Sequence, residues 1–357
     1  MKVLHVDSAR GWRGGQNQVL LSARGMARRG HQVVLACQRG GALEQRARAD
    51  GLDVCSLRFQ GDLSPLAVAG LGALVRRERP QVVQAHDPHA LSCALLARPL
   101  GPRAALVATR RVDFALRGRW SRWKYARAAR VIAVSAAVRA VMLRDGLPDG
   151  ALRLVYEGVP DRAPAPGGAA ALRALGVPEG APVVGNVAAL AGHKDQATLL
   201  RAARQVLDRR PDVHFVIVGD GPLRAPLEAL HRELGLGRAC VFAGFRPDVE
   251  ALLAAFDVFC LSSHMEGLGT SLLDAMAFGR PIVATAAGGI PEAVEDGVNG
   301  RVVPPRDPAA LAAALLDVLG DGDRRAALGR AGRRRFEERF TDERMVEGTL
   351  RVYEELA

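Results

Sequence analysis

The sequence has few cysteines and no pattern that would connect them. The chain of 357 residues contains five, with no CxxC pair and no cluster of cysteine and histidine: Cys37, Cys55, Cys93, Cys240 and Cys260. This spacing argues against a disulfide framework or a zinc site, and it is typical of free thiols in a reducing compartment. We therefore expect a cytoplasmic protein.

Long apolar runs are missing as well. The longest, Leu63 to Val75, falls short of the roughly 20 residues of a membrane-spanning helix and contains Pro65 and two glycines. Near the N-terminus, Asp7 interrupts the chain before the apolar segment of a secretory signal could form. The sequence thus predicts neither a membrane span nor a signal peptide.

Acidic residues are outnumbered. Lys and Arg total 49 against 38 Asp and Glu, a formal net charge of +11. Such an excess favours an anionic partner, either nucleic acid, a phosphate-bearing substrate or lipid headgroups, although an arginine-rich composition alone would also produce it. Because no helix-turn-helix, zinc or RNA-binding signature occurs, we expect no nucleic-acid partner.

What the chain does contain is apolar residues, 49% of the total, in short β-branched runs that alternate with helical stretches. This alternation indicates parallel sheets with helices on both faces. A segment rich in Pro, Gly and Ala, residues 163–180, separates two such series. The expected strands are 2–7, 31–37, 82–87, 105–110 and 130–135 in the first series, and 182–188, 213–220, 240–245, 258–263 and 281–286 in the second.

We therefore predict an α/β protein with two doubly wound, Rossmann-like domains, residues 1–162 and 181–340, joined by the linker 163–180. Ligands of such sheets bind at the carboxyl ends of the strands. The cleft between the two domains is the expected active site.

The stretch "HMEGLGTSLLDAMA" (264–277) carries two carboxylates around the start of a predicted helix. Glycines let a backbone approach a diphosphate closely, and a helix N-terminus favours anions. Glu266 and Asp274 would be about 12 Å apart along a continuous helix, too far for an acid/base pair. They suit the two ends of an extended ligand such as a nucleotide sugar; the alternative is an ordinary surface helix.

Residues 216–230 and 242–315 resemble the C-terminal half of the family 4 glycosyltransferases. The resemblance covers most of 180–340 and is looser in the N-terminal half. It implies a GT-B fold and a retaining enzyme that transfers a sugar from a nucleotide-diphosphate sugar. It also implies that the final helix, 341–357, crosses back to the N-terminal domain.

The resemblance assigns roles to individual residues. Glu266 would hold hydroxyls of the donor sugar, and Asp274, where the family usually has Glu, would bind the ribose. Lys194 would neutralise the leaving diphosphate. Ala189 stands where the family has an arginine, and the candidates to replace that charge are Arg111, His193 or Arg246, between which the sequence does not decide. The implied donor-binding residues are Gly14, Gly15, Lys194, Glu266, Gly267, Leu268, Gly269, Thr270 and Asp274.

In the N-terminal half, the resemblance points to two further places. Gly14 and Gly15 lie in a glycine-rich loop that would face the donor phosphates and the acceptor. His86 would lie at a strand end near the reacting sugar, so the implied catalytic residues are His86, Lys194 and Glu266. A lone histidine is more often structural, which is the alternative for His86.

The implied reaction is attack of an acceptor hydroxyl on the same face as the leaving diphosphate, with no second carboxylate as nucleophile. Lys194 and a helix N-terminus would stabilise the leaving group, so we expect no metal ion and no cofactor besides the nucleotide sugar. The alternatives are a catalytically degenerate GT-B protein that binds glycans, a sugar-nucleotide epimerase and a phosphorylase.

Residues 110–130 hold eight basic residues against one acid, interleaved with Phe114, Trp120, Trp123 and Tyr125. Such a segment suits an anionic membrane surface. We expect peripheral contact with the inner face of the cytoplasmic membrane, and an acceptor that is a glycan or glycolipid, such as lipopolysaccharide or another lipid-linked cell-envelope glycan. The alternative is a solvated loop with its tryptophans in the core.

Overall fold

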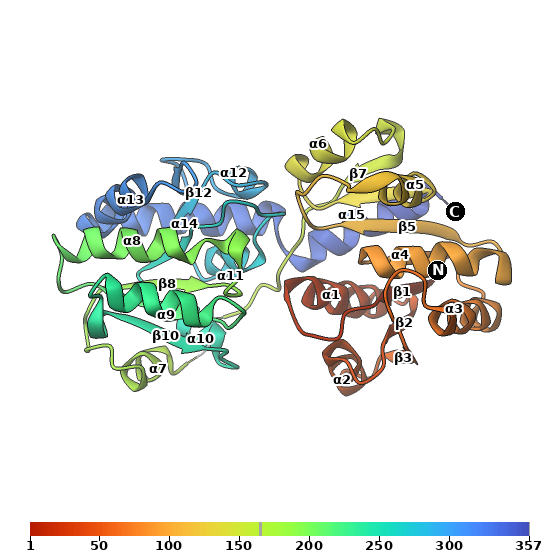
Figure 1. The fold of residues 1–357 in the computed structure, drawn as a ribbon, viewed down its shortest axis with the longest axis horizontal. Helices are drawn as coiled ribbons and strands as arrows, with labels where there is room; N and C mark the ends of the chain where they lie inside the picture. Colours follow the sequence, from red (N-terminus) through yellow and green to blue (C-terminus); the bar gives the residue numbers. More distant parts are fainter. Residues whose placement is uncertain (164–165, 357) are drawn as a thin grey trace. The chain divides into compact units, whose positions relative to one another are not determined.

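The computed structural model describes residues 1–163 and 166–356 and divides the chain into two compact units. Unit 1 comprises Met1–Gly158 and Thr341–Ala357, and unit 2 comprises Val159–Phe340. Each contains one parallel sheet flanked by helices (Figure 1). The predicted fold class is confirmed.

The seven strands of unit 1 run in the order β3-β2-β1-β4-β5-β6-β7, all parallel. The order reverses between β1 and β4, and this switch point is where open α/β sheets bind ligands. The strands are β1 (Lys2–Asp7), β2 (Gln32–Gln38), β3 (Asp53–Leu57), β4 (Val82–Ala85), β5 (Ala105–Arg110), β6 (Arg130–Ala133) and β7 (Leu152–Leu154).

Helices cover both faces of this sheet. One face packs against α1 (Gly14–Arg28), α2 (Ala42–Ala49) and α15 (Asp342–Glu354). The other packs against α3 (Pro65–Glu78), α4 (Pro88–Ala97) and α5 (Gly118–Ala126). The remaining helices are α6 (Ala136–Arg144), η1 (Arg98–Leu100) and η2 (Asp149–Ala151).

The final helix, α15, is part of unit 1. Gly25 of α1 allows a close approach, because a Cβ there would lie 2.5 Å from Cγ2 of Val346. The hydroxyl of the buried Tyr353 donates to Oε1 of Gln84 in β4, whose amide in turn donates to Thr109 Oγ1 at 2.8 Å. A buried hydroxyl needs such a partner, so this bond fixes α15 on the sheet.

Unit 2 repeats the architecture with six parallel strands in the order β10-β9-β8-β11-β12-β13. Its switch point lies between β8 and β11. The strands are β8 (Val183–Val187), β9 (His214–Val218), β10 (Cys240–Gly244), β11 (Val258–Leu261), β12 (Ile282–Thr285) and β13 (Gly300–Val303). The helices are α7 (Gly168–Ala174), α8 (Gln196–Leu207), α9 (Arg224–Glu233), α10 (Val249–Ala255), α11 (Thr270–Ala277), α12 (Ile290–Ala293), α13 (Pro308–Gly320), α14 (Gly322–Arg339), η3 (Gly192–Lys194) and η4 (Gly237–Ala239).

The segment expected to be a linker, 163–180, contains helix α7, which packs against α10 in unit 2. Residues 164–165 of that segment lie outside the described part of the chain. Residues 159–162, which we expected in the N-terminal domain, belong to unit 2.

Three strands were missed by the sequence analysis: β3, β7 and β13. Each lies at or near a sheet edge, where one side faces solvent, and none is a continuous apolar run.

No helix of residues 1–163 and 166–356 is both long enough and apolar enough to cross a membrane.

Candidate functional site

The predicted site residues fall into two groups, one in each unit. Gly14, Gly15 and His86 belong to unit 1, and the others belong to unit 2. Each group lies at the switch point of its own sheet, because His86 follows β4 while η3 and Glu266 follow β8 and β11.

In unit 2 the structure brings Lys194 and Glu266 together. Their side chains form an ion pair, and both are mostly buried, with 17% and 12% of the side chain exposed. Ser263 Oγ donates to the same Glu266 oxygen at 3.2 Å. A cation and a carboxylate therefore converge at one point beyond the ends of β8 and β11, although 72 residues separate them in the sequence.

Backbone contacts hold this pair in place. The N–H of His264 donates to the carbonyl of His193 at 2.9 Å, and Ser262 Oγ donates to the carbonyl of Lys194 at 3.1 Å. The N–H of Gly289 donates to the carbonyl of Glu266 at 3.2 Å. The loops after β8 and β11 are thus joined to each other, so the position of Lys194 relative to Glu266 is set by the sheet.

The loop from Glu266 leads into α11 through Gly269, which has a φ of +92°. This left-handed conformation is accessible to glycine at little cost. Leu268 is fully buried and anchors the loop, and Thr270 begins the helix. Gly267 precedes Leu268 in the same turn, so the expected strand–loop–helix arrangement of 264–277 is present.

Asp274 lies on the second turn of α11, apart from Glu266 in the preceding loop. Burial raises the pKa of its carboxyl to about 6, partly offset by the positive charge of Arg162. Arg162 itself pairs with Glu250. A carboxylate in such surroundings is a strong acceptor for a hydroxyl that would enter the site.

This raised pKa predicts a pH-dependent cost to stability. Between pH 3.8 and about 6 the folded protein keeps a proton on Asp274 that the unfolded chain has lost. The free energy of unfolding therefore decreases as the pH rises from 3.8 to about 6. Above pH 6 the cost is constant, at most about 3 kcal/mol. Asp274→Asn should therefore increase the free energy of unfolding in urea at pH 7.5 and change it little at pH 4.

The exposed Asp208→Asn serves as the control and should change the free energy of unfolding only slightly. Equal effects of Asp274→Asn at pH 4 and pH 7.5 would show that burial does not raise the pKa of the Asp274 carboxyl.

The "GDGP" turn (219–222) supports the loop after β8. A Cβ on Gly219, whose φ is +132°, would lie 2.0 Å from the carbonyl oxygen of Ala188, and one on Gly221 would lie 2.4 Å from that of Leu190. The N–H of Leu190 donates to the carbonyl of Asp220 at 3.1 Å. These glycines permit the close approach of two loops, which positions the segment that leads to Lys194.

Ala189 stands in that loop, where the resemblance places an arginine. Of the substitutes we considered, Arg246 forms an ion pair with Asp248 at 2.6 Å, and Arg111 belongs to unit 1. The carbonyl of His193 accepts the N–H of His264. Lys194 is the cation that forms an ion pair with Glu266.

In unit 1, His86 is buried, and both of its ring nitrogens have partners. Nε2 lies 2.7 Å from Nδ1 of His5, and Nδ1 lies 3.1 Å from a guanidinium nitrogen of Arg111. Because Arg111 can only donate, Nδ1 of His86 accepts, and its proton lies on Nε2. His86 then donates to His5, whose proton lies on its own Nε2, a buried atom without a partner among the described residues.

Burial, with Arg111 as the second cause, lowers the pKa of His5 to about 3. Burial, then Arg111 and then His5, lowers the pKa of His86 well below its ordinary value. Both rings are therefore neutral at physiological pH. Sequence reasoning missed His5 and Glu157, which accepts from Arg111 Nε at 3.0 Å; their only signal was a polar residue in or after an apolar strand.

Gly14 and Gly15 begin α1, and a Cβ on Gly15 would lie 3.7 Å from Cδ of Arg111. The neighbouring Asp87 caps α4, accepting from the N–H groups of His89 and Ala90 at 2.9 Å. It also accepts from the N–H of Ser8 at 2.7 Å, which joins the loops after β1 and β4. Gly15, His86 and Arg111 thus form one group at the switch point of unit 1.

Comparison with known proteins covers both halves of the chain. The family model described as Glycosyltransferase Family 4 matches residues 12–163, and the one described as Glycosyl transferases group 1 matches residues 170–335. The second match contains Lys194, Glu266 and Asp274, and the first contains Gly14, Gly15 and His86.

The chain is similar to curated proteins over part of its length and part of theirs. A GDP-mannose-dependent alpha-(1-6)-phosphatidylinositol monomannoside mannosyltransferase of Mycolicibacterium smegmatis is 39% identical over 153 residues, 40% of each chain. The lipopolysaccharide core biosynthesis glycosyltransferase LpsE of Rhizobium meliloti is 33% identical over 148 residues, 42% of this chain and 44% of the relative. The chain thus spans about two-fifths of the length of these relatives.

Among solved structures, Anabaena HepE in complex with UDP and glucose has a TM-score of 0.87 and 24% sequence identity, over 99% of this chain and 100% of that one. This likeness shows a shared fold, and the two family models together cover nearly the whole sequence. The chain is a member of the family 4 glycosyltransferases and has the GT-B fold.

Proposed function

We propose that the protein transfers a sugar from a nucleotide-diphosphate sugar to an acceptor hydroxyl, with retention of the anomeric configuration. The observation that carries this proposal is the Lys194–Glu266 pair at the switch point of unit 2. It offers a cation for a diphosphate and a carboxylate for sugar hydroxyls at one point. Two names support the donor class: the mycobacterial relative is GDP-mannose-dependent, and HepE was solved with UDP.

In the proposed step the bond between the anomeric carbon and the diphosphate oxygen breaks, and the acceptor oxygen bonds to the same carbon. The acceptor proton passes to the leaving diphosphate. Lys194 stabilises the charge that grows on that group, and Glu266 orients the sugar through its hydroxyls. Asp274 accepts from the ribose. The reaction as proposed uses Lys194 as its cation and needs no metal ion.

The group in unit 1 is proposed to act on the acceptor side. Because both nitrogens of His86 are engaged, its ring does not serve as a general base there. We assign it the role of a positioning residue that holds the Arg111 guanidinium beside Gly15 and Glu157. A neutral histidine suits this role, since it adds no charge to that of Arg111.

The experiment is an assay of nucleoside diphosphate release from UDP-, GDP- and ADP-sugars, with and without a bacterial lipid extract as acceptor. Release that depends on the extract, with a product of the same anomeric configuration as the donor by NMR, supports the proposal. Conversion of the donor sugar to an isomer would indicate an epimerase instead. A product of inverted configuration would contradict retention.

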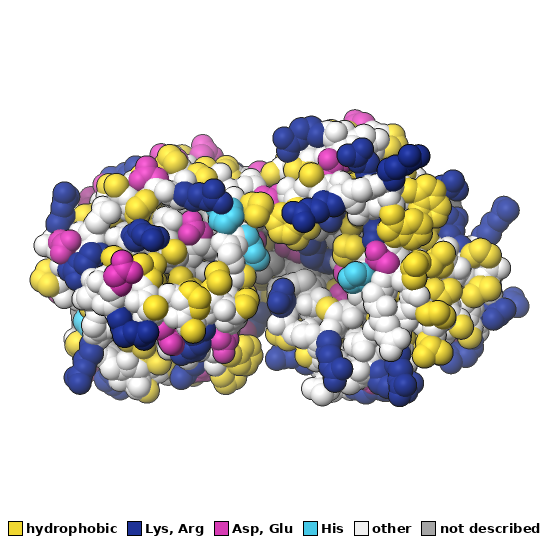
Figure 2. Space-filling model, in the orientation of Figure 1, with side chains coloured by type: hydrophobic (Ala, Val, Ile, Leu, Met, Phe, Trp, Pro, Cys, Tyr) yellow, Lys and Arg dark blue, Asp and Glu magenta, His cyan; other side chains and the backbone are white. Residues whose placement is uncertain are grey.

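We further propose that unit 1 contacts an anionic membrane and that the acceptor is a lipid-linked or cell-envelope glycan. Trp120 and Trp123 of α5 are about 40% exposed and stack on each other at 4.9 Å, so they do not lie in the core as the alternative reading requires. Figure 2 shows hydrophobic side chains gathered over α5 and over α3, with basic side chains beside them. Exposed tryptophans beside arginines suit the headgroup region of a bilayer.

Two residues of the segment 110–130 that we expected at the membrane surface are buried instead. Lys124 is 2% exposed, and its Nζ donates to Pro88 O at 2.8 Å and to Ser92 Oγ at 3.1 Å, besides pairing with Asp62. A buried ammonium needs such acceptors, so Lys124 anchors α5 to α4 and does not face a membrane. Tyr125 is buried too. Arg117, Arg119 and Arg122 remain exposed.

Replacing Arg117, Arg119 and Arg122 by glutamine should weaken binding to vesicles of phosphatidylglycerol and phosphatidylcholine at least tenfold, because each charge near an anionic surface contributes about 1 kcal/mol. Sedimentation with vesicles measures it. The matched control replaces three exposed arginines of unit 2, Arg201, Arg232 and Arg238, and should bind as the unaltered protein does. Equal losses in the two triple variants would mean that net charge, and not this surface, governs binding.

A further inference from the structure

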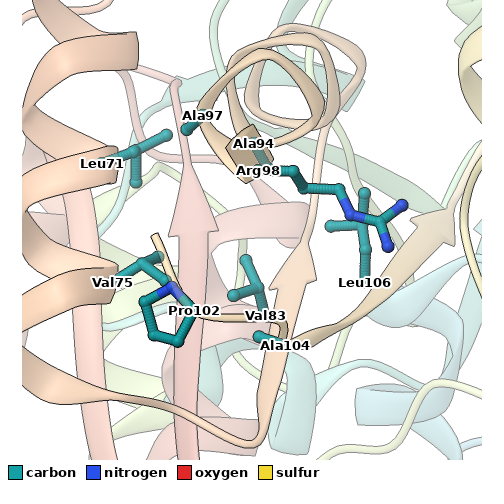
Figure 3. A pocket seen from close by; sticks show the side chains of 9 residues that line it. All are labelled: Leu71, Val75, Val83, Ala94, Ala97, Arg98, Pro102, Ala104 and Leu106. Atoms are coloured by element: carbon teal, nitrogen blue, oxygen red, sulfur yellow. The ribbon is translucent and has the colours of Figure 1, made fainter. Parts of the chain in front are cut away.

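Two leucines at the start of α3 are exposed to solvent. Leu63 and Leu66 are 66% and 62% exposed, more than any other large apolar side chain of unit 1. The inward face of α3 is already packed, because its Leu71 and Val75 face a pocket against β4 and β5 that holds only about 20 Å³, room for one water molecule (Figure 3). Most of the surface of Leu63 and Leu66 therefore lacks a partner in the described part of unit 1.

The turn that carries these leucines is fixed by its own contacts. Ser64 caps α3, since its Oγ accepts from the N–H of Ala67 at 3.4 Å and donates to the carbonyl of Arg58 at 2.9 Å. Pro65 begins the helix, where its preset φ is favourable, and the buried Phe59 anchors the preceding segment in the core. The exposure of the two leucines is therefore a property of the fold.

A buried lysine joins this turn to α5. Nζ of Lys124 pairs with Oδ1 of Asp62 at 3.3 Å, and Asp62 directly precedes Leu63. Trp120 and Trp123, which are 39% and 41% exposed, lie on the same helix as Lys124. Hydrophobic side chains gather over α3 and α5 on one side of unit 1 (Figure 2). We call the exposed side chains of Leu63, Leu66, Trp120 and Trp123 the leucine–tryptophan surface.

Positive charge flanks the leucine–tryptophan surface. The segments 58–66 and 110–126 contain two acids, of which Asp62 pairs with Lys124 and Asp113 is half-buried. Exposed apolar side chains with a charged rim mark a site of interaction, and arginines in that rim favour an anionic partner. An anionic bilayer has both an apolar interior and negative headgroups. The exposed arginines of the two segments are Arg58, Arg117, Arg119 and Arg122.

We propose that the leucine–tryptophan surface inserts into the apolar part of an anionic bilayer, with the flanking arginines at the lipid phosphates. The inference rests on the membrane contact proposed above, and it adds an apolar insertion by the start of α3 to the charge attraction of α5. A second copy of the chain fits this surface less well, because a two-fold contact would bring the arginines of both copies together.

Insertion here would bring the candidate site of unit 1 close to the lipid. The carbonyl of Pro88 accepts from Nζ of Lys124 at 2.8 Å, and Pro88 is two residues from His86. The leucines follow β3, α5 follows β5 and His86 follows β4, so all three lie at the carboxyl edge of one parallel sheet. An acceptor hydroxyl bound beside His86 would therefore lie near the lipid headgroups.

The test is the partition of the full chain onto vesicles of phosphatidylglycerol and phosphatidylcholine, measured by sedimentation at about 0.1 M and about 1 M NaCl. Replacing Leu63 and Leu66 by serine should lower the partition coefficient at least tenfold at both salt concentrations, because salt does not screen apolar transfer. Replacing both by phenylalanine should retain binding. The matched control replaces the exposed Phe245 and Val298 of unit 2 by serine and should bind as the unaltered protein does.

The outcomes separate this inference from the membrane contact on which it rests. Unchanged binding of the serine variant, together with weaker binding of the triple arginine variant described above, would overturn the apolar insertion and leave the membrane contact standing. The absence of binding by the unaltered protein would overturn both. Sedimentation equilibrium without vesicles tests the other occupant: a dimer of the unaltered protein that the serine variant does not form would assign the surface to a second copy.

Discussion

Glu266→Gln is expected to lower kcat/KM for sugar transfer about a thousandfold without unfolding the protein. Glutamine keeps the shape of the side chain and its contact with Ser263, but it removes the negative charge that Lys194 and the sugar hydroxyls meet. Groups of this kind, set in advance for a transition state, contribute 10²–10³ in rate. Initial rates of nucleoside diphosphate release measure the effect, and circular dichroism checks the fold.

The matched control is Glu233→Gln, on the surface of the same unit, which should retain full activity. An active Glu266→Gln variant would remove the donor-sugar role from this residue. A variant that loses binding of the nucleotide diphosphate as strongly as that of the nucleotide sugar would place Glu266 on the phosphates instead.

Lys194→Gln is expected to lower kcat about a hundredfold, because the leaving diphosphate then loses its cation. Its charge is held by η3 and by the loop contacts at His193 and Ser262, so the position survives the substitution. Lys194→Arg keeps the charge and should recover at least a tenth of the activity. Steady-state kinetics with saturating donor give kcat directly.

The two residues act at one point, so their effects should not add. The double variant of Lys194 and Glu266 should lose about as much activity as Glu266→Gln alone, since a site without one member already lacks the arrangement. Full additivity of the two losses would show that the residues serve separate steps. A wild-type kcat in Lys194→Gln would show that Lys194 does not stabilise the leaving diphosphate.

The alternation of apolar runs and helices was enough to predict the fold class. A strand buried on both faces needs a continuous apolar run, and "FVIV" in β9 and "VFCL" in β11 are such runs. The edge strands β3, β7 and β13 do not form continuous apolar runs, and for this reason the sequence analysis missed them. Pairing order could not be read from the runs, so the switch points became visible only in the sheets.

For the site, the motifs located Lys194 and Glu266 singly, but their contact depends on two loops joined by backbone bonds, which leave no mark in the sequence. His86 was expected to face the active site as a catalytic group. The structure surrounds its ring with His5 and Arg111, residues 81 and 25 positions away, and only the fold brings these together. The role of His86 therefore remains a prediction, now as a positioning residue.

Lys124 is a residue whose position could not be predicted from the composition of its segment. Within a segment of eight basic residues it looks like its neighbours, and its charge was counted toward a membrane surface. Acceptors from the loop at Asp62 and from the start of α4 make it internal instead. Charge density alone does not distinguish a solvated lysine from one that joins two helices.

The central claim is that the Lys194–Glu266 site binds a nucleotide sugar. The measurement is a thermal-unfolding series of the full chain and of Glu266→Gln with UDP, GDP, ADP and CMP and with their sugar conjugates. A ligand of the folded state at a hundred times its Kd adds about 2.7 kcal/mol of stability, enough for a shift of a few degrees. We predict that one nucleoside diphosphate stabilises both proteins and that its sugar conjugate adds a further shift only where Glu266 is present. No shift with any nucleotide, or the same further shift in Glu266→Gln, would contradict the account.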